Sequence, residues 1–179
     1  MRRLQRHDRD LMRPLFFVCC FLVALLAAGP SAPLALAAAE PGGAPPVPRF
    51  VSFKASEVNL RVGPGQRFPI EWVYRRVGYP VEVIAEFDLW RQIRDVDGTT
   101  GWVHQSLLSG RRTALVHGGM RTLRAEPDDA AEGVALAEPG VQVDLALCQG
   151  DWCEVKSEAY VGWLKRAELW GIYPGEVVP

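Results

Sequence analysis

The chain has few of the residues on which catalysis and metal binding depend. Beyond the apolar N-terminal segment its only histidines are His104 and His117, and its only cysteines are Cys148 and Cys153. No serine stands in the setting of a nucleophile elbow, and the acidic residues lack a recognisable paired spacing for acid–base hydrolysis. We therefore expect no catalytic set, no metal site and no cofactor, and we interpret the protein as non-enzymatic.

Two further absences narrow the choice of fold and partner. No apolar stripe with a period of 3.6 residues is long enough to predict a helix. Positive charge is not concentrated: residues 50–112 carry nine Lys/Arg and seven Asp/Glu, whereas residues 120–173 carry five and ten. Nucleic-acid binding needs a basic face, so we expect no nucleic-acid partner. The second half is clearly acidic.

The N-terminal residues have the pattern of a secretory signal. Several arginines precede an unbroken apolar run over 15–28, which is shorter than the ~20 residues of a membrane-spanning helix. Gly29 and Pro30 then break the run, and small residues before Glu40 fit a cleavage site. We predict a signal peptide over 1–39 and a periplasmic or secreted protein, with membrane contact only before cleavage. A retained N-terminal anchor is the alternative.

Export would place the two remaining cysteines in an oxidising compartment. Cys148 and Cys153 are separated by a stretch of hairpin-loop length, so they can face each other across two strands. In an oxidising compartment such a pair most often forms a disulfide, which we predict, with a stabilisation of only roughly 2 kcal/mol. A metal site is the alternative, but two sulfurs without neighbouring His or Cys ligands do not make one.

The remainder of the chain is a linker followed by a duplication. Residues 40–49 are rich in Pro and Gly and predict a linker. Short strand patterns follow, and four landmarks recur in the same order at an offset near 62, which indicates a repeat. The landmark pairs are Leu60-Arg61 with Leu123-Arg124, Val81-x-Val83 with Val141-x-Val143, Trp90 with Trp152, and Gly101-Trp102 with Gly162-Trp163.

This repeat predicts two small all-β domains. A unit of ~60 residues is near the lower limit for a domain with its own core, and short strands separated by turns favour a small barrel or sandwich. We place the domains at 50–112 and 120–175, with a short linker over 113–119. Because this linker is short, the two domains should lie side by side.

The first copy resembles the bacterial SH3 (SH3b) family. It opens with Asn-Leu-Arg-Val-Gly-Pro-Gly at 59–65, while the second copy keeps Leu123-Arg124 but has Glu126 where the first has Gly63. The resemblance implies two tandem SH3-like barrels, of the kind found in exported proteins of Gram-negative bacteria. It says little about the ligand, because one fold hosts many functions. The other matching residues are Trp90-x-x-Ile93, Gly101-Trp102-Val103 and Leu107.

Candidate ligand-binding residues gather in the first copy. Aromatic and arginine side chains around a Pro/Gly loop are typical of a groove that binds a peptide or glycan. Phe68 and Trp72 have the alternative role of closing the barrel end. Arg61 could hold a carboxylate bidentately, or it could form an internal ion pair. The predicted binding residues are Arg61, Phe68, Trp72, Tyr74, Trp90 and Trp102.

The spacing of the tryptophans predicts which side chains face the core. Trp90 and Ile93 stand three residues apart, as do Trp152 and Val155, and in a regular strand this spacing puts them on opposite faces. If the aliphatic residue of each pair faces the core, the tryptophan therefore does not, unless a bulge beside the turn alters the alternation. For the adjacent pairs Trp102-Val103 and Trp163-Leu164 we likewise expect the aliphatic residue inside.

Three functional hypotheses follow. The leading one is a periplasmic binding module that recognises cell-wall (peptidoglycan) peptide or an envelope protein through the first domain. The alternative is a scaffold or accessory subunit that docks a protein partner through the acidic second domain. A third, a small hydrolase, would require a cluster of ionisable residues in a cleft.

Overall fold

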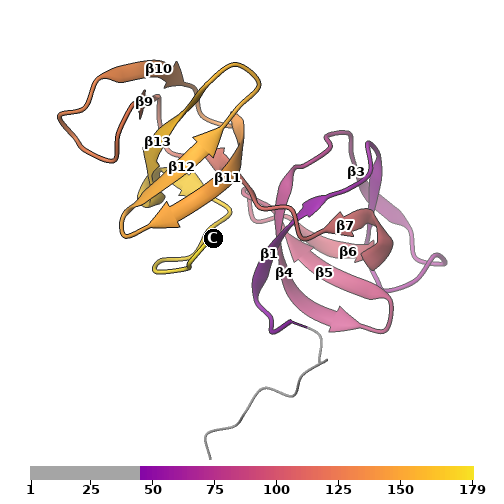
Figure 1. Ribbon diagram of the computed structural model, residues 1–179. Coiled ribbons are helices and arrows are strands. Elements are labelled where there is room, and N and C mark those ends of the chain that lie inside the picture. Colours follow the sequence, from indigo (N-terminus) through magenta and orange to yellow (C-terminus); the bar gives the residue numbers. More distant parts are fainter. Residues whose placement is uncertain (1–44) are drawn as a thin grey trace, which may run out of the picture. The chain divides into compact units, whose positions relative to one another are not determined.

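The computed structural model describes residues 45–179, so the predicted signal peptide and the first part of the predicted linker lie outside the described residues. Strands dominate this part of the chain, with two short 3-10 helices between them, and the strands are distributed over two sheets (Figure 1). The predicted all-β fold of two tandem SH3-like domains is therefore confirmed. None of the helices described over 45–179 is long and apolar enough to span a membrane.

The first barrel is a seven-stranded antiparallel sheet with the strand order β3-β2-β6-β5-β4-β1-β7. β4 pairs with β5, and β5 pairs with β6. Short turns such as Asp97-Gly98 permit these pairings. The elements are β1 (Arg49–Phe53), β2 (Val58–Arg61), β3 (Ile70–Tyr74), β4 (Pro80–Phe87), β5 (Trp90–Arg94), β6 (Thr100–His104), η1 (Gln105–Leu107) and β7 (Leu108–Ser109).

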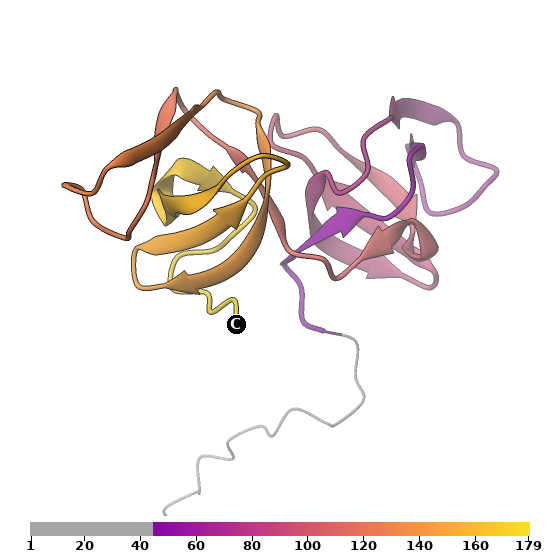
Figure 2. The same cartoon turned by 45° about the horizontal axis from the view of Figure 1, so that its top comes forward.

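The second barrel repeats this topology strand for strand. Its sheet has the order β10-β9-β13-β12-β11-β8-β14, and in the view turned by 45° its strands curl around a common core as those of the first barrel do (Figure 2). The elements are β8 (Thr113–Val116), β9 (Arg121–Arg124), β10 (Gly133–Ala137), β11 (Gln142–Gln149), β12 (Trp152–Lys156), β13 (Val161–Lys165), η2 (Arg166–Glu168) and β14 (Leu169–Trp170).

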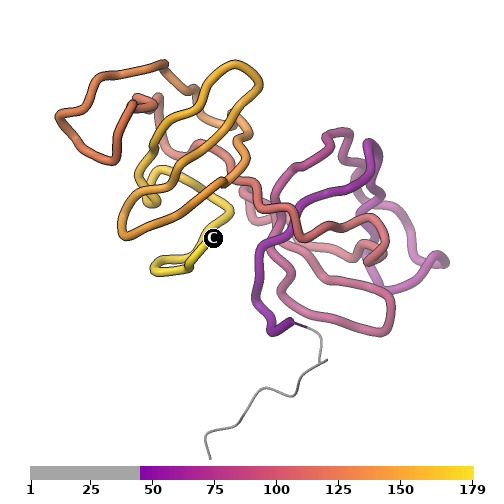
Figure 3. The backbone as a smooth tube through the Cα atoms, in the orientation of Figure 1, coloured from indigo at the N-terminus to yellow at the C-terminus, as the bar shows by residue number. Residues whose placement is uncertain are grey.

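The structure differs from the sequence prediction at the junction of the copies. Within the predicted linker 113–119, Thr113–Val116 forms β8, and all four of its residues are buried. The physical reason is that these largely apolar residues supply the strand that pairs with β11, as β1 pairs with β4 in the first barrel. The tube of Figure 3 accordingly passes from one barrel to the other with no long connection.

The register also corrects one of the repeat landmarks. Val83 pairs with Ile93 in the first barrel, and the residue that pairs with Val155 in the second is Leu145. Val81 and Val83 therefore correspond to Val143 and Leu145, which are buried, and not to residues 141 and 143. The Val-x-Val pattern misled because a shift of two residues preserves the alternation of a strand.

Each barrel has its own hydrophobic core. In the first, Phe53 and Leu60 pack with the valines of β4, and Tyr74 and Tyr79 stack against the ring of Phe53. In the second, Leu164 and Val155 pack beside Cys148 and Cys153. These cysteines are directly opposite each other on β11 and β12 and form a disulfide, which confirms the predicted pairing.

Both barrels, over the described residues 45–179, belong to one compact unit. The Tyr173 hydroxyl of the C-terminal segment donates to Glu82 Oε1 at 2.7 Å, and its ring lies 4.7 Å from that of Phe50. Burial raises the pKa of Tyr173, and the hydrogen bond to Glu82 adds to this effect. Arg94 completes the cluster through two bonds to Glu82 Oε2 at 2.5 and 2.9 Å.

Candidate functional site

Two tryptophans lie on the outer face of the first barrel's sheet. Trp90 on β5 pairs with His104, and Gln92 on the same strand pairs with Trp102 on β6. Residues two apart on a strand share a face, so Trp90 and Trp102 stand diagonally on one surface. Both are partly buried, whereas Ile93 and Val103 are fully buried. The sequence prediction that the aliphatic residues face the core is thus confirmed.

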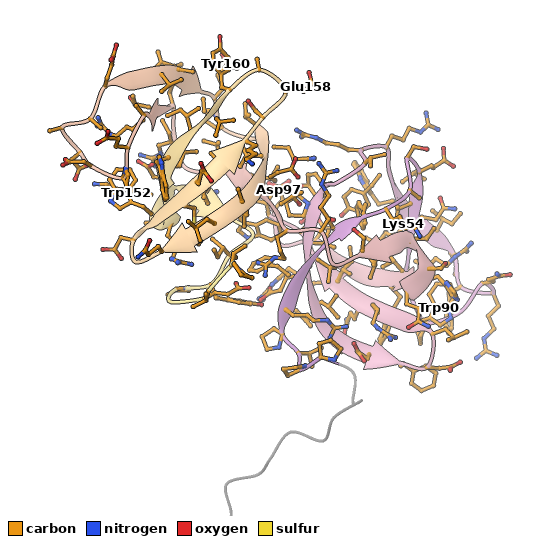
Figure 4. All side chains as sticks on the ribbon, viewed as in Figure 1. Lys54, Trp90, Asp97, Trp152, Glu158 and Tyr160 are labelled. Carbon is orange, nitrogen blue, oxygen red and sulfur yellow. A yellow bond between two sulfur atoms is a disulfide. The ribbon has the colours of Figure 1, made fainter. Side chains whose placement is uncertain are left out.

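The second barrel carries the same pair. Trp152 on β12 pairs with Lys165, and Glu154 pairs with Trp163 on β13. Val155 and Leu164 point into the core. We call each surface, Trp90 with Trp102 and Trp152 with Trp163, the tryptophan face of its barrel. Trp90 and Trp152 are labelled in Figure 4.

The partners beside these tryptophans differ between the copies, and sequence reasoning missed them. In the first barrel the His104 ring stands edge-on to Trp90, with ring centroids 5.5 Å apart. In the second barrel the Lys165 ammonium lies 5.4 Å from the Trp152 ring. The signal was present in the sequence, because His104 and Lys165 each follow a Gly-Trp-aliphatic motif directly, but only the strand register places them against the first tryptophan.

The arginine of each Leu-Arg motif fixes the loop beside the tryptophan face. Arg61 Nη1 donates to the carbonyl of Phe68 at 2.7 Å and to that of Gln66 at 3.2 Å. Arg124 Nη1 donates to the carbonyl of Ala131 at 2.9 Å, and both bonds reach seven residues along the chain. Arg61 therefore stabilises the loop by donating to its carbonyl oxygens, and not through the internal ion pair that was the alternative.

The glycine of each Gly-Trp motif allows β6 and β13 to approach that same Leu-Arg segment. A Cβ on Gly101 would lie 2.5 Å from Leu60 Cγ and 3.0 Å from the Arg61 carbonyl oxygen. A Cβ on Gly162 would lie 2.6 Å from the Arg124 carbonyl oxygen. Real Cβ atoms do not come this close to other atoms, so only glycine fits at either position. In each copy, the Gly-Trp motif thus packs directly against the Leu-Arg motif.

The loop of the first barrel is filled by Phe68. Its ring would lie 2.6 Å from a Cβ on Gly63, and the Arg67 guanidinium carbon lies 5.2 Å from its centroid. Phe68 is partly buried, so it packs the loop. In the second copy Glu126 and Ala131 occupy the positions of Gly63 and Phe68. The smaller Ala131 explains how that copy tolerates a side chain at residue 126.

Trp72 and Tyr74 have opposite environments although both are on β3. Trp72 is 59% exposed on this edge strand, so it does not close the barrel end. Tyr74 is in the core, and its hydroxyl donates to Asp95 Oδ2 at 2.7 Å. Burial raises the pKa of Tyr74, and the bond to Asp95 raises it further. Of the predicted binding residues, the structure therefore brings Trp90 and Trp102 together beside Arg61, leaves Trp72 on the edge and buries Tyr74.

Several ionisable groups in residues 45–179 form structural contacts. No group of three or more His, Cys, Asp or Glu side chains in these residues could hold a metal ion. His104 Nδ1 lies 2.7 Å from Ser106 Oγ and accepts from the Ser106 backbone N–H, which caps η1. The Asp95 carboxylate receives the N–H groups of Asp97 and Thr99 and so shapes a turn.

The fold and the two tryptophan faces define a tandem SH3-like module with one partly exposed aromatic surface in each copy. The family model described as "Bacterial SH3 domain" matches the chain twice, over residues 54–110 and 118–171. The chain therefore belongs to the bacterial SH3 domain family.

Two solved structures resemble the chain at low identity. NlpC2 from Trichomonas vaginalis is 12% identical, with a TM-score of 0.33, over 69% of this chain and 48% of that one. NlpC1 from the same organism is 12% identical, with a TM-score of 0.32, over 71% and 47%. The chain thus spans about half the length of these proteins. Among curated proteins, none matches the sequence.

Proposed function

We propose that this protein is a non-enzymatic module of the bacterial cell envelope that binds peptide, such as the peptide of peptidoglycan, through the tryptophan face of the first barrel. The observation that carries this proposal is that Trp90 and Trp102 lie diagonally on the same outer face of the sheet, where both are partly exposed. Tryptophan contributes large, rigid contact area and dominates binding energy in many interfaces. Bacterial SH3 domains usually bind peptidoglycan or proteins, which agrees with this use of the face.

The surroundings of the pair suit an extended peptide. Gln92 lies beside Trp102 in the strand register and offers an amide to main-chain groups. The neighbouring loop is held by Arg61, so one border of the surface is formed before the ligand arrives. A preformed surface avoids the entropy cost of ordering the loop on binding.

The placement in the envelope follows from the N-terminal pattern. The arginines and apolar run before residue 29 favour export, and a disulfide between Cys148 and Cys153 suits an oxidising compartment. We accordingly place the protein in the periplasm or outside the cell. There its ligand is cell-wall peptide or the exposed segment of an envelope protein.

Retention on purified peptidoglycan tests the proposal. We expect the protein without its first 39 residues to sediment with peptidoglycan, and Trp90→Ala or Trp102→Ala to reduce the retained fraction about tenfold, as for an interface hot spot. Tyr160→Ala, which removes an exposed aromatic from the second barrel, is the matched control and should be retained. Peptidoglycan stripped of its peptides should retain little protein. Equal retention of wild type and both tryptophan variants would contradict the proposal.

A further inference from the structure

The second barrel contains an apolar pocket next to its edge strand β10. The pocket has a volume of 210 Å³ and is lined by residues 135–137 of β10 together with buried residues of the core. Among residues 45–179, those that line it include no charged side chain. The site therefore suits an uncharged, apolar group, and we call it the β10 pocket. The core residues in its lining are Leu123, Val143, Val155 and Leu164.

The strand register identifies the corresponding positions of the first barrel. The edge strand β3 ends at Tyr74 and the edge strand β10 ends at Ala137, at the same point of register with the Leu-Arg strand. The carbonyls of Tyr79 and Val141 accept equivalent backbone bonds from the last residues of β1 and β8. Two tyrosines of the first barrel are thus replaced by alanine and valine, and both of these smaller residues line the β10 pocket.

In the first barrel, aromatic rings of the chain itself fill this place. Tyr74 and Tyr79 stack with their ring centroids 5.7 Å apart, and both lie against the ring of Phe53. The stack ends where the Tyr74 hydroxyl donates to Asp95. The barrel fold of this chain therefore accommodates aromatic rings here when the chain supplies them.

The polar partner of the stack has changed together with the rings. Ser157 takes the position of Asp95, because each follows by two residues the core aliphatic of its strand, Val155 or Ile93. Ser157 lines the β10 pocket. The tyrosine rings and their carboxylate acceptor are thus both absent from the corresponding positions of the second barrel, and their place is an open pocket and not a repacked core.

The volume of the pocket limits what can fill it. A cavity of about 150 Å³ with apolar walls holds one benzene molecule, whereas pockets for drug-sized ligands have about 300–1,000 Å³. The β10 pocket, at 210 Å³, has room for a single ring with a short stem. An empty apolar cavity lowers stability, and a ligand that binds the folded state stabilises it by mass action.

The strand beside the pocket can pair with an extended chain. Within the described residues β10 is at the end of its sheet and pairs with β9 alone (Figure 1). Its outward-facing Val134 and Leu136 are 41% and 68% exposed. A sheet edge binds an extended segment through main-chain hydrogen bonds, while a pocket for a side chain gives specificity. A free ring would leave these apolar side chains uncovered, which favours a peptide as the occupant.

We propose that the β10 pocket binds the phenylalanine or tyrosine side chain of an extended segment of a partner protein. The ring takes the place that Tyr74 and Tyr79 fill in the first barrel, and the main chain of the segment lies along β10. The site uses no residue of the first barrel's tryptophan face, so it does not rest on the proposed function.

Methyl NMR with a free ring and two matched peptides tests the inference. The probes are toluene and acetylated, amidated Thr-Val-Phe-Val-Thr and Thr-Val-Ala-Val-Thr, added to the protein without its first 39 residues. A bound ring shifts the methyl signals of Leu123, Val155 and Leu164, which line the pocket. We expect these shifts from toluene and from the phenylalanine peptide. That peptide should bind at least about tenfold more tightly than the alanine peptide, because a phenylalanine side chain is buried.

Ala137→Tyr supplies the missing ring from within the chain. Alone, or with Ser157→Asp to restore the tyrosine–carboxylate pair of the first barrel, it should abolish the toluene shifts and weaken the phenylalanine peptide about tenfold. Ala130→Tyr makes the same change at an exposed loop position of the same barrel and is the matched control. It should change the dissociation constant less than about twofold, as surface substitutions do. The wild-type comparison of the two peptides stands whether or not these variants fold.

Several outcomes would overturn the inference. They are the absence of toluene shifts, equal binding of the two peptides, and an equal effect of Ala130→Tyr and Ala137→Tyr. Dimerisation of the wild type that Ala137→Tyr abolishes, measured by analytical ultracentrifugation, would assign the pocket to a second copy of the chain and also overturn it. Because the proposed function is read by retention on peptidoglycan, failure in one experiment leaves the other result intact.

Discussion

The two barrels stabilise the same hairpin by different chemistry. In the second, Cys148 and Cys153 are opposite each other on β11 and β12 and are joined by a disulfide. In the first, the opposed positions on β4 and β5 hold Glu86 and Arg91, which form an ion pair at 3.1 Å. Arg49 also contacts Glu86 at 2.5 Å. Each copy thus links the two strands at the same position, one by a covalent bond and the other by an ion pair.

The comparison extends to the two tryptophan faces and the loops beside them. The first barrel sets His104 beside Trp90, and the second sets Lys165 beside Trp152. The loops differ more, since the first contains Phe68 and Arg67 and the second carries several carboxylates. The strand order, the arginine-to-loop bonds and the Gly-Trp contacts are the same in both copies, while the exposed side chains differ.

The contact that the copies share should be the most sensitive to mutation. Gly101→Ala and Gly162→Ala should each lower the free energy of unfolding by about 3 kcal/mol, because the new methyl group overlaps a carbonyl oxygen and a leucine that cannot both move. Urea titration followed by far-UV circular dichroism measures the loss. Gly110→Ala, where nothing lies within 4 Å of the new Cβ, is the control. An effect in only one copy would show that the copies differ in packing.

The hairpin bonds should give the next largest effect. Reducing the disulfide should cost the second barrel about 2 kcal/mol through loop-closure entropy, while Glu86→Gln should cost the first about 1 kcal/mol because the pair is partly exposed. Hydrogen exchange of the β5 and β12 amides measures the two hairpins separately. If dithiothreitol lowers protection in β5 as much as in β12, the barrels unfold as a single cooperative unit, and the comparison of separate hairpins fails.

The smallest expected effect is the alkaline loss of stability contributed by Tyr79 of the first barrel, in addition to that from Tyr74 and Tyr173, whose pKa values are also raised. Burial raises the pKa of Tyr79 from 10.0 to about 12, so the folded state disfavours the phenolate. This stabilising contribution is complete below pH 10 and is lost as the pH rises through about 12. Val141 takes the position of Tyr79 in the second barrel. Tyr79→Phe should therefore flatten the dependence of unfolding free energy on pH between 10 and 12; an unchanged slope would count against this.

Sequence reasoning reached the fold, the duplication, the disulfide and the inward-facing aliphatic residues. These features depend on alternation and spacing, which are local properties of the chain. It did not find the role of Arg61, because every residue carries a carbonyl and no pattern tells which one a guanidinium will meet. It grouped Tyr74 with exposed aromatics although the residue is buried. It also did not place the C-terminal residues 169–175 beside Trp152, because their position depends on tertiary contacts.

The arginine anchor has a consequence for how such modules diversify. Arg61 and Arg124 bind carbonyl oxygens at the far end of their loops and touch no loop side chain through these bonds. The anchoring bonds therefore do not depend on which side chains the loop carries, provided that the residues at its two ends fit each other, as Gly63 fits Phe68 and Glu126 fits Ala131. Within that limit, substitutions between the arginine and its carbonyl partner leave the anchor intact. The two copies of this chain have diverged in loop sequence in this way while keeping the same backbone contact.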